Sequence, residues 1–358
     1  MPGDRGTPKA SPAGREAPAS DRLGAVRAAV HDLKAPSPRQ ELWKKLRVLV
    51  SLAMLAGIAY LARKYDVTRA FRATDPLYIV LGIAAYMGGQ LVAAKRWHSV
   101  LHRSGFRPPY LAVFRANTIG MYSSNFLPGV AGGDLVRPIA LYGTATVHKP
   151  QLYASVVFER LGGIGSIVVL ATVGGLWSGL TRGDWRYLGV AAVILAGIAA
   201  LLGLTHLARH ARLSGDSRFM RLLSKLKEGS EHLMRYALHP GLVSMVLAYS
   251  LLFQMGYILM FWCFLQSLGA HASLFSVLLA APLAWLASMT PISLNGLGVR
   301  EGTLVVVLMQ LGIPKAEVTG AALMGLVPLF LISALGALWS LKMFSHIGAH
   351  TDAAAGGH

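Results

Sequence analysis

Long apolar runs alternate with basic connectors along most of the chain. A helix needs about 20 mostly apolar residues to cross the hydrocarbon core of a bilayer. Six runs meet or approach this length and predict full spans, at residues 46–62, 77–94, 151–177, 187–208, 241–268 and 320–343. The pattern therefore predicts an all-α, polytopic integral membrane protein with about six full spans.

Two further apolar stretches, at 110–142 and 274–311, are broken by prolines, glycines and charged residues. At their centres lie the sequences NFLPGVAGGDLVRP, residues 125–138, and TPISLNGLGVREG, residues 290–302. Proline ends a preceding helix, and glycine allows a close approach of the backbone. The residues expected to shape the two breaks are Pro128, Gly129, Gly132, Gly133, Pro291, Gly296 and Gly298. Because irregular backbone is tolerated in hydrocarbon only where it is buried in protein or lines a wet cavity, we predict two re-entrant helical hairpins around such a cavity.

The charge of the chain is +18, from 34 Lys and Arg against 16 Asp and Glu, and the basic residues cluster between the apolar runs. The positive-inside rule then places the N-terminus, the connector at 95–107 and the basic loop at 209–240 in the cytoplasm. Such loops face anionic lipid headgroups, so nucleic-acid binding is not expected. This topology makes the two hairpins enter from opposite faces, as in an inverted repeat, and paired Gly/Pro-interrupted segments indicate the binding site of a transporter.

The two ends of the chain differ from its apolar middle. Residues 1–44 are rich in proline and small or charged residues and contain no apolar run, so they predict a tail that is disordered or lies on the membrane surface. The membrane domain is expected at 45–345, followed by a C-terminal tail at 346–358. Four tryptophans near the ends of predicted spans are expected in the interfacial aromatic belts, namely Trp97, Trp177, Trp185 and Trp339.

Several charged residues fall within the apolar regions. An ionised side chain at the bilayer centre costs about 2.5–3.5 kcal/mol on insertion scales, so each of them needs a partner or a purpose. They are Asp134, Arg137, Glu159, Arg160, Arg300 and Glu301. Asp134 and Arg137 share a face if the chain is helical there, whereas the adjacent Arg300 and Glu301 are expected to point in different directions.

These charges have two interpretations. In the first, an arginine binds a lipid phosphate through two hydrogen bonds while a carboxylate neutralises or releases it. With Asn125 and Asn295 of the same two segments, the six charged residues then form a substrate-binding set. In the second interpretation the charges form an ion-pair network that pins the hairpins without contacting a substrate. Both can hold together.

Other kinds of site have little support in the sequence. His98 and His102 are four residues apart, as are His206 and His210, but basic residues lie beside both pairs and no acid is near, so we expect histidines facing headgroups and no bound metal. The chain lacks a Walker motif and a nucleophile elbow, which gives no support to nucleotide or acyl hydrolysis. No cofactor is expected.

Three motifs occur in a characteristic order: N-x-x-P-G-x-x-G-G-D-x-x-R from Asn125, F-E-R-L-G-G from Phe158, and P-x-S-x-N-G-x-G-x-R-E-G from Pro291. In this order they resemble the lysylphosphatidylglycerol synthase transmembrane-region family, the flippase-like membrane domain of multiple-peptide-resistance-factor proteins. The similarity covers roughly residues 45–345. It implies a multi-helix membrane domain with two re-entrant hairpins that moves a lipid between leaflets.

The resemblance also bears on particular residues and on the cargo. The charged motif positions of the family fall on Asp134, Arg137, Glu159, Arg300 and Glu301. Full-length relatives carry a cytoplasmic aminoacyl-transferase domain after the membrane region, whereas this sequence ends at His358. The resemblance is therefore to a stand-alone member, for which synthesis of an aminoacylated lipid is not expected. Stand-alone members serve varied lipids, including polyprenyl-linked glycans and hopanoids.

We therefore expect a lipid flippase of the bacterial inner membrane, with a cytoplasmic N-terminus and no enzymatic activity of its own. Its cargo is expected to be an anionic phospholipid or a polyprenyl- or hopanoid-type lipid. One alternative is an intramembrane lipid-headgroup or glycosyl transferase that uses the carboxylates as acid and base. Another is a non-catalytic scaffold of a lipid-synthesis complex. A lipid-synthesis enzyme and a second copy of the chain are candidate partners.

Overall fold

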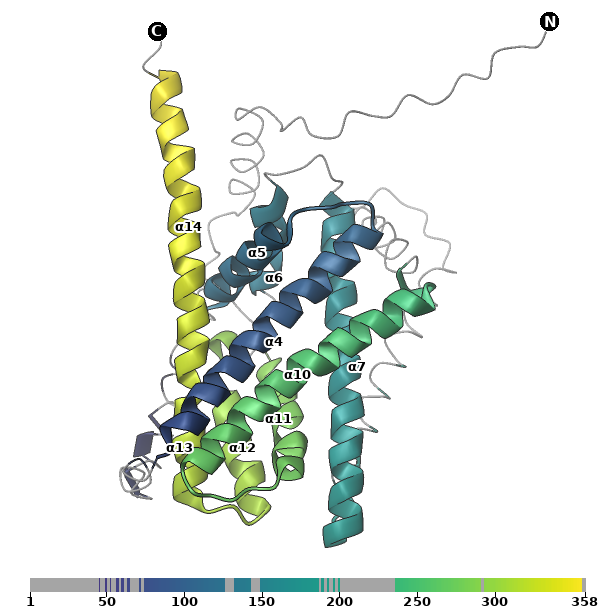
Figure 1. Cartoon of the computed structure of the whole chain (residues 1–358), viewed down its shortest axis with the longest axis vertical. Coiled ribbons are helices and arrows are strands. Elements are labelled where there is room, and N and C mark those ends of the chain that lie inside the picture. The colour runs from purple at the N-terminus through teal and green to yellow at the C-terminus, as the bar shows by residue number, and fades with distance from the viewer. Residues whose placement is uncertain are drawn as a thin grey trace, which may run out of the picture.

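The structure is a computed structural model. It describes residues 74–125, 132–142, 149–186, 236–290 and 293–355, with isolated positions between 45 and 71 and between 188 and 199. The helices, shown in Figure 1, are α4 (Pro76–Arg103), α5 (Tyr110–Ser124), α6 (Gly132–Tyr142), α7 (Lys149–Arg182), α10 (Pro240–Ser267), α11 (Leu274–Ser288), the 3-10 turn η1 (Leu294–Gly296), α12 (Val299–Gln310), α13 (Lys315–Met324) and α14 (Leu326–Ala355). The part of the chain that these ranges cover contains helices and no strand.

Some predicted features lie wholly or mostly outside the described residues. They are the tail at 1–44, the spans at 46–62 and 187–208, the basic loop at 209–240, and the hairpin residues Pro128, Gly129 and Pro291. At the other end of the chain, α14 runs on to Ala355, beyond the predicted boundary of the membrane domain at residue 345.

Four helical segments of the described ranges are long and apolar enough to cross a membrane: α4, Gln151–Arg182 of α7, α10, and Lys315–Leu341 across α13 and α14. They coincide with four of the six predicted spans. The total of six stays a prediction.

The two broken stretches form pairs of short helices. The first pair is α5, of 15 residues, and α6, of 11; the second is α11, of 15, and α12, of 12. Each is shorter than the roughly 20 residues that cross a bilayer. Figure 1 shows α5 and α6 toward one end of the long helices and α11 and α12 toward the other. Two hairpins that enter from opposite sides would be placed in this way, although re-entry itself stays a prediction.

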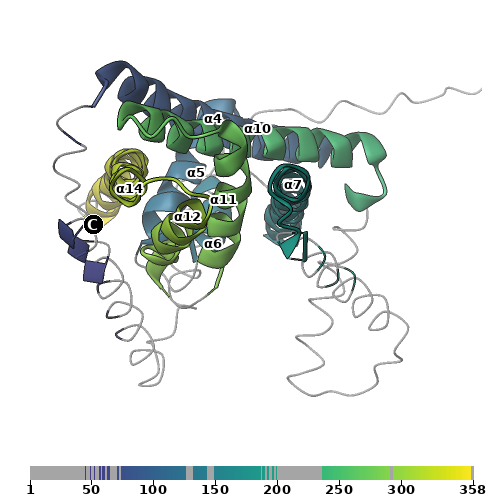
Figure 2. The same cartoon turned by 90° about the horizontal axis from the view of Figure 1, so that it is seen from below.

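An antiparallel pair, α4 and α10, lies across the other helices (Figures 1 and 2). Asp75 joins their ends, because its carboxylate accepts from the N–H of Leu77 at 2.9 Å and its own N–H donates to the carbonyl of Ser267 at 3.0 Å. Midway, a Cβ on Gly256 would lie only 2.7 Å from the carbonyl oxygen of Ala85. Such small residues let membrane helices approach closely. The pair therefore packs backbone against backbone.

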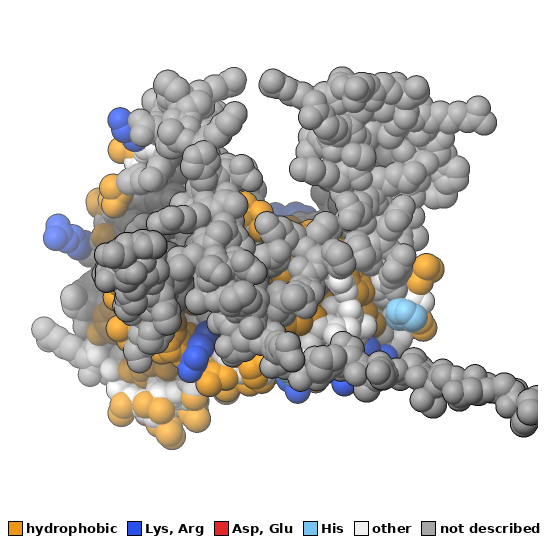
Figure 3. Space-filling model, turned by 90° about the horizontal axis from the view of Figure 1, so that it is seen from above, with side chains coloured by type: hydrophobic (Ala, Val, Ile, Leu, Met, Phe, Trp, Pro, Cys, Tyr) orange, Lys and Arg blue, Asp and Glu red, His pale blue; other side chains and the backbone are white. Residues whose placement is uncertain are grey.

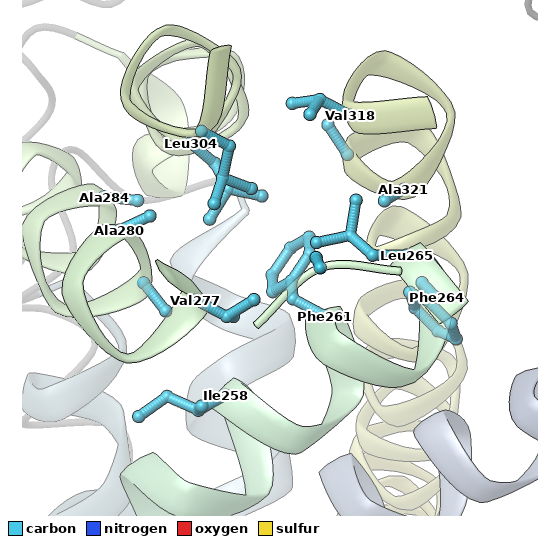
Figure 4. Close-up of a cluster of buried hydrophobic side chains, with 14 of the residues drawn as sticks. Ile258, Phe261, Phe264, Leu265, Val277, Ala280, Ala284, Leu304, Val318 and Ala321 are labelled. Carbon is cyan, nitrogen blue, oxygen red and sulfur yellow. The ribbon is translucent and has the colours of Figure 1, made fainter. Parts of the chain in front are cut away.

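A cluster of buried hydrophobic side chains joins α10 to α11, α12 and α13. Figure 4 shows Phe261 and Leu265 of α10 among Val277 of α11, Leu304 of α12 and Val318 of α13. All five are buried. Within a bilayer the hydrophobic effect does not stabilise such a cluster, because lipid tails are as apolar as the side chains themselves. Close van der Waals packing stabilises it instead. The cluster holds the second short helix pair against α10.

The outward sides of the helices are apolar. On α7 the exposed large hydrophobic residues are Val157, Val169, Val173, Leu176 and Leu180. Figure 3, which views the end of the molecule where α4 finishes, shows Lys and Arg side chains among hydrophobic ones on the described surface. Exposed apolar surface of this extent is typical of membrane contact. The described helices thus form a membrane protein with apolar outer faces.

Substitution of Gly256 and Gly88 by alanine tests the packing of α4 against α10. A Cβ on Gly88 of α4 meets nothing within 4 Å, whereas one on Gly256 meets the backbone of α4. Alanine favours a helix by about 1 kcal/mol over glycine, so Gly88→Ala should not lower the unfolding temperature in detergent micelles. Gly256→Ala should lower it, because overpacking costs about 1–3 kcal/mol and backbone atoms cannot rotate away. Thermal unfolding followed by circular dichroism measures both, and equal shifts would contradict the close contact.

Candidate functional site

A cavity of about 120 Å³ with several charged residues in its lining lies between the helices. Its lining comes from both short helix pairs and from α4, α7, α10 and α14. The charged residues that line it are Arg96, Asp134, Arg137, Glu159, Arg160 and Arg300. The structure therefore gathers around one space charged residues that lie far apart in the sequence.

Glu159 of α7 is the centre of a buried ion-pair network. One of its oxygens, Oε1, accepts from Nε and Nη2 of Arg96 on α4, at 3.0 and 2.6 Å. The other, Oε2, accepts from Nη2 of Arg137 on α6 at 2.8 Å. The residue is only 1% exposed, so its charge is compensated by these two arginines and not by water.

Asp134 extends the network along α6 and α7. Its Oδ2 accepts from Nε of Arg160 at 2.6 Å, and its Oδ1 accepts from Nη2 of Arg160 at 2.9 Å. Oδ1 also lies 3.3 Å from Nη1 of Arg137, three residues along the same helix. The shared helix face predicted for Asp134 and Arg137 is confirmed. Three arginines and two carboxylates thus tie α4, α6 and α7 together.

The sequence interpretation missed Arg96. It placed Arg96 in a cytoplasmic connector at 95–107. Because α4 continues to Arg103, Arg96 lies within a helix, and its placement in a connector is wrong; the cytoplasmic side stays a prediction. Its neighbours Ala93 and Val100, three residues before and four after, are buried on the same helix face, whereas Lys95 is exposed. That helical spacing is the signal that could have found Arg96. Its Nη1 also donates to Oγ of Ser250 on α10 at 2.8 Å, which connects the network to the α4–α10 pair.

Trp97 is also placed differently from the prediction. It was expected in an interfacial aromatic belt, but its side chain is 0% exposed. The guanidinium of Arg137 lies 4.4 Å from the centre of its ring, and its indole N–H donates to Oγ of Ser155 at 3.0 Å. Trp97 therefore supports the charged network, because cation–π contacts are strongest where water is excluded.

Arg300 and Glu301 form a second charged group at the start of α12. Nε and Nη2 of Arg300 donate to Oε1 of Glu301 at 2.9 and 2.5 Å, so the expectation that the two side chains diverge is wrong. The physical reason is the helix start: Glu301 folds back so that its Oε2 accepts from the N–H of Gly298 at 2.7 Å. Its Oε1 is then left facing its neighbour. The anion that occupies this helix N-terminus is Glu301 itself.

Asn125 and Asn295 connect the tips of the two short helix pairs. Nδ2 of Asn295 donates to Oδ1 of Asn125 at 2.9 Å, and Nδ2 of Asn125 donates to Oγ of Ser333 on α14 at 2.5 Å. Asn295 has φ 49°, a left-handed conformation that asparagine tolerates better than most residues. The structure therefore brings together the two asparagines that the sequence analysis selected.

Glycines shape the described parts of both breaks. A Cβ on Gly133 would collide with the carbonyl oxygen of Gly120 and with Oγ of Ser124, so glycine is needed for α6 to pack this closely on α5. Gly296 and Gly298 have φ of 72° and 82°, which favour glycine. Gly132 begins α6.

One of the two histidine pairs, His98 and His102, lies within the described residues. The rings of His98 and His102 lie 4.0 Å apart. Within the ranges that the structure describes, no group of three or more His, Cys, Asp or Glu side chains could hold a metal ion. His206 and His210 lie outside those ranges.

Residues 46–336, which include the whole described cavity, match the family described as the lysylphosphatidylglycerol synthase TM region. The chain belongs to this family. It is also similar to a UPF0104 membrane protein of Pyrococcus horikoshii, with 23% identity over 325 residues that cover 84% of this chain and 97% of the relative. The resemblance carried by the three sequence motifs is thereby confirmed. Membership is consistent with a role related to membrane lipids, and the roles of individual site residues stay predictions.

A double-mutant cycle on Arg96 and Glu159 tests the network. Each single change, Arg96→Gln or Glu159→Gln, should lower the free energy of unfolding by about 3–5 kcal/mol, because removal of one partner leaves a buried charge uncompensated. The double variant should lose clearly less than the sum. Arg186→Gln is the control, since Arg186 pairs with Asp184 and is 82% exposed, and it should change little. Unfolding in detergent micelles provides the measurement, and additive losses would contradict the coupling.

Proposed function

We propose that the protein moves a lipid between the two leaflets of its membrane. The cargo is an anionic phospholipid or a polyprenyl- or hopanoid-type lipid, whose headgroup enters the cavity while its tails stay in the bilayer. The observation that carries this proposal is a cavity lined by four arginines, among helices with apolar outer faces. No step requires nucleotide chemistry.

The cavity offers a charged headgroup partners of opposite charge, which the hydrocarbon of the bilayer lacks. A charge that crosses the bilayer centre unassisted faces a cost of several kcal/mol, and a partner of opposite sign reduces it. Arginine is suited to this task because its planar donors match phosphate oxygens. Four arginines line the cavity, against two carboxylates. The lining therefore favours a negatively charged headgroup.

The outer surface lies close to the cavity. Leu135 is the next residue after Asp134, yet it is 58% exposed on the outer side of α6. Cavity and apolar surface are thus separated by the width of a single helix. A lipid can keep its tails against that surface while its headgroup contacts the charged residues.

A carrier of this kind has to open toward each side of the membrane in turn. The contacts between the helices that line the cavity differ in the free energy needed to break them. A neutral hydrogen bond such as that between Asn125 and Asn295 contributes only about 0.5–1.5 kcal/mol, whereas losing a partner of a buried ion pair costs about 3–5 kcal/mol. We therefore place the moving boundary between the tips of the two short helix pairs. The network of α4, α6 and α7 stays fixed.

The transferase alternative has weaker support. Each oxygen of Asp134 and Glu159 accepts a hydrogen bond from an arginine, and this pairing makes both carboxylates weaker general bases. We therefore propose that the lipid leaves the protein chemically unchanged.

Arg300→Gln tests the proposed transport. Loss of a charge-assisted hydrogen bond, worth about 1.5–3 kcal/mol, should slow exchange of a fluorescent lipid in proteoliposomes about tenfold or more. Arg115→Gln is the matched control, because Arg115 is exposed and does not line the cavity, and its exchange rate should equal that of the unsubstituted protein.

Three results would contradict the proposal. If folded Arg300→Gln exchanged lipid as fast as the unsubstituted protein, the cavity would not be part of the transport route. No exchange above that of protein-free vesicles would favour the scaffold. A chemically altered lipid, detected by mass spectrometry, would favour the transferase.

Cross-linking tests the movement at the tips. Asn125→Cys and Asn295→Cys would be introduced together with Cys263→Ala, which removes the one native cysteine. A short bis-methanethiosulfonate reagent should join the two thiols and stop lipid exchange, because the tips can no longer separate. Reduction should restore exchange, and each single-cysteine variant treated alike should keep it. Undiminished exchange in fully cross-linked protein would show that the tips do not move.

A further inference from the structure

We infer that the cavity selects a headgroup with one net negative charge and no amine, such as the phosphate diester of phosphatidylglycerol. The proposed function identifies a lipid as the source of this group. The binding preference itself follows from the charges, hydrogen bonds and size of the cavity.

The charge balance of the site leaves room for one anion. The two charged groups contain four arginines, Arg96, Arg137, Arg160 and Arg300, and three carboxylates, Asp134, Glu159 and Glu301. One positive charge among these described residues is thus uncompensated. A ligand with a single negative charge neutralises the site, whereas a cationic or zwitterionic headgroup leaves the imbalance in place.

The carboxylates are already occupied. Both oxygens of Asp134 and of Glu159 accept from arginines, and both oxygens of Glu301 accept from Arg300 and from the N–H of Gly298. An ammonium group would have to compete with these arginines for the carboxylate oxygens. The site therefore disfavours ethanolamine and aminoacyl headgroups.

Two buried donors in the lining have no partner among the described residues. They are Nε of Arg137 and the hydroxyl of Tyr257. Both residues line the cavity and are more than nine-tenths buried, at 6% and 3% exposure. Buried polar groups in native proteins nearly always have a hydrogen-bond partner. Neither atom is itself exposed to the cavity, so an oxyanion supplies acceptors to both after a small movement of their side chains.

The cavity has the size of a headgroup and not of a whole lipid. Its volume of about 120 Å³ is several times the space that one water molecule needs. Phe253 and Trp285 contribute apolar surface to the lining. A phosphate with its first ester carbons fits this mixture of arginine and aromatic groups.

Calorimetric titration of the full chain in detergent micelles tests the selectivity, with dihexanoyl phosphatidylglycerol and dihexanoyl phosphatidylethanolamine as probes. The anionic lipid should bind about tenfold more tightly, because the two probes differ mainly in the amine. Equal or tighter binding of the ethanolamine lipid would overturn the inference. Inorganic phosphate is the third probe: weaker binding than the anionic lipid supports a lipid source, and tighter binding overturns it.

Tyr257→Phe tests the unpartnered hydroxyl. Because the hydroxyl has no partner in the described protein, its removal should leave the unfolding temperature unchanged or raised and should weaken binding of the anionic lipid about threefold to tenfold. Tyr236→Phe is the matched control: it removes another buried hydroxyl, outside the cavity, and should not alter binding. Unchanged affinity in folded Tyr257→Phe would overturn the role of this hydroxyl.

Transport is measured separately, with tail-labelled forms of the same two lipids in proteoliposomes. Selective binding without exchange would contradict the proposed transport and leave the anion selectivity intact. Exchange of both lipids at equal rates, with no difference in binding, would contradict the selectivity and leave the transport intact.

Discussion

A charge removed from water has to be compensated by its neighbours. In this protein the central buried charge is that of Glu159. Its two oxygens bind arginines from two other helices, Arg96 and Arg137. Since each uncompensated charge would cost several kcal/mol, the three helices have little freedom to separate. Asp134 and Arg160 extend the same constraint. The position of the cavity wall follows from it.

The rest of the fold holds this network from two sides. The close backbone contact of α4 with α10 fixes the helix that carries Arg96. The guanidinium of Arg96 also donates to the hydroxyl of Ser250 on α10, which restrains its position further. On the other side, α11 packs closely against α7, where a Cβ on Gly174 would lie 2.9 Å from Cα of Leu279, and the cluster around Phe261 joins α11 and α12 to α10. Ion pairs on one side and side-chain packing on the other therefore hold the residues that line the cavity.

Sequence periodicity predicted four of the spanning segments and both broken stretches, because apolar length and proline or glycine breaks are local properties. It also predicted that Asp134 and Arg137 share a face. It failed for Arg96, since a basic residue near the end of an apolar run has the same local pattern whether it faces headgroups or a carboxylate 63 residues away. Nor could it predict that Arg300 turns to Glu301, because that contact depends on how the helix start is capped, or that Tyr257 of α10 lines the cavity.

The separation of Arg96 from Glu159 also matters for biosynthesis. The two residues are 63 positions apart, so translation at about 5–20 residues per second delays the carboxylate by about 3–13 s after the arginine has been made. During that interval the guanidinium of α4 lacks the carboxylate that compensates its charge in the folded protein. The long arginine side chain can extend to the headgroup layer, where its charge stays hydrated until the carboxylate is available. The ion pair between α4 and α7 can form only after α7 has emerged from the ribosome.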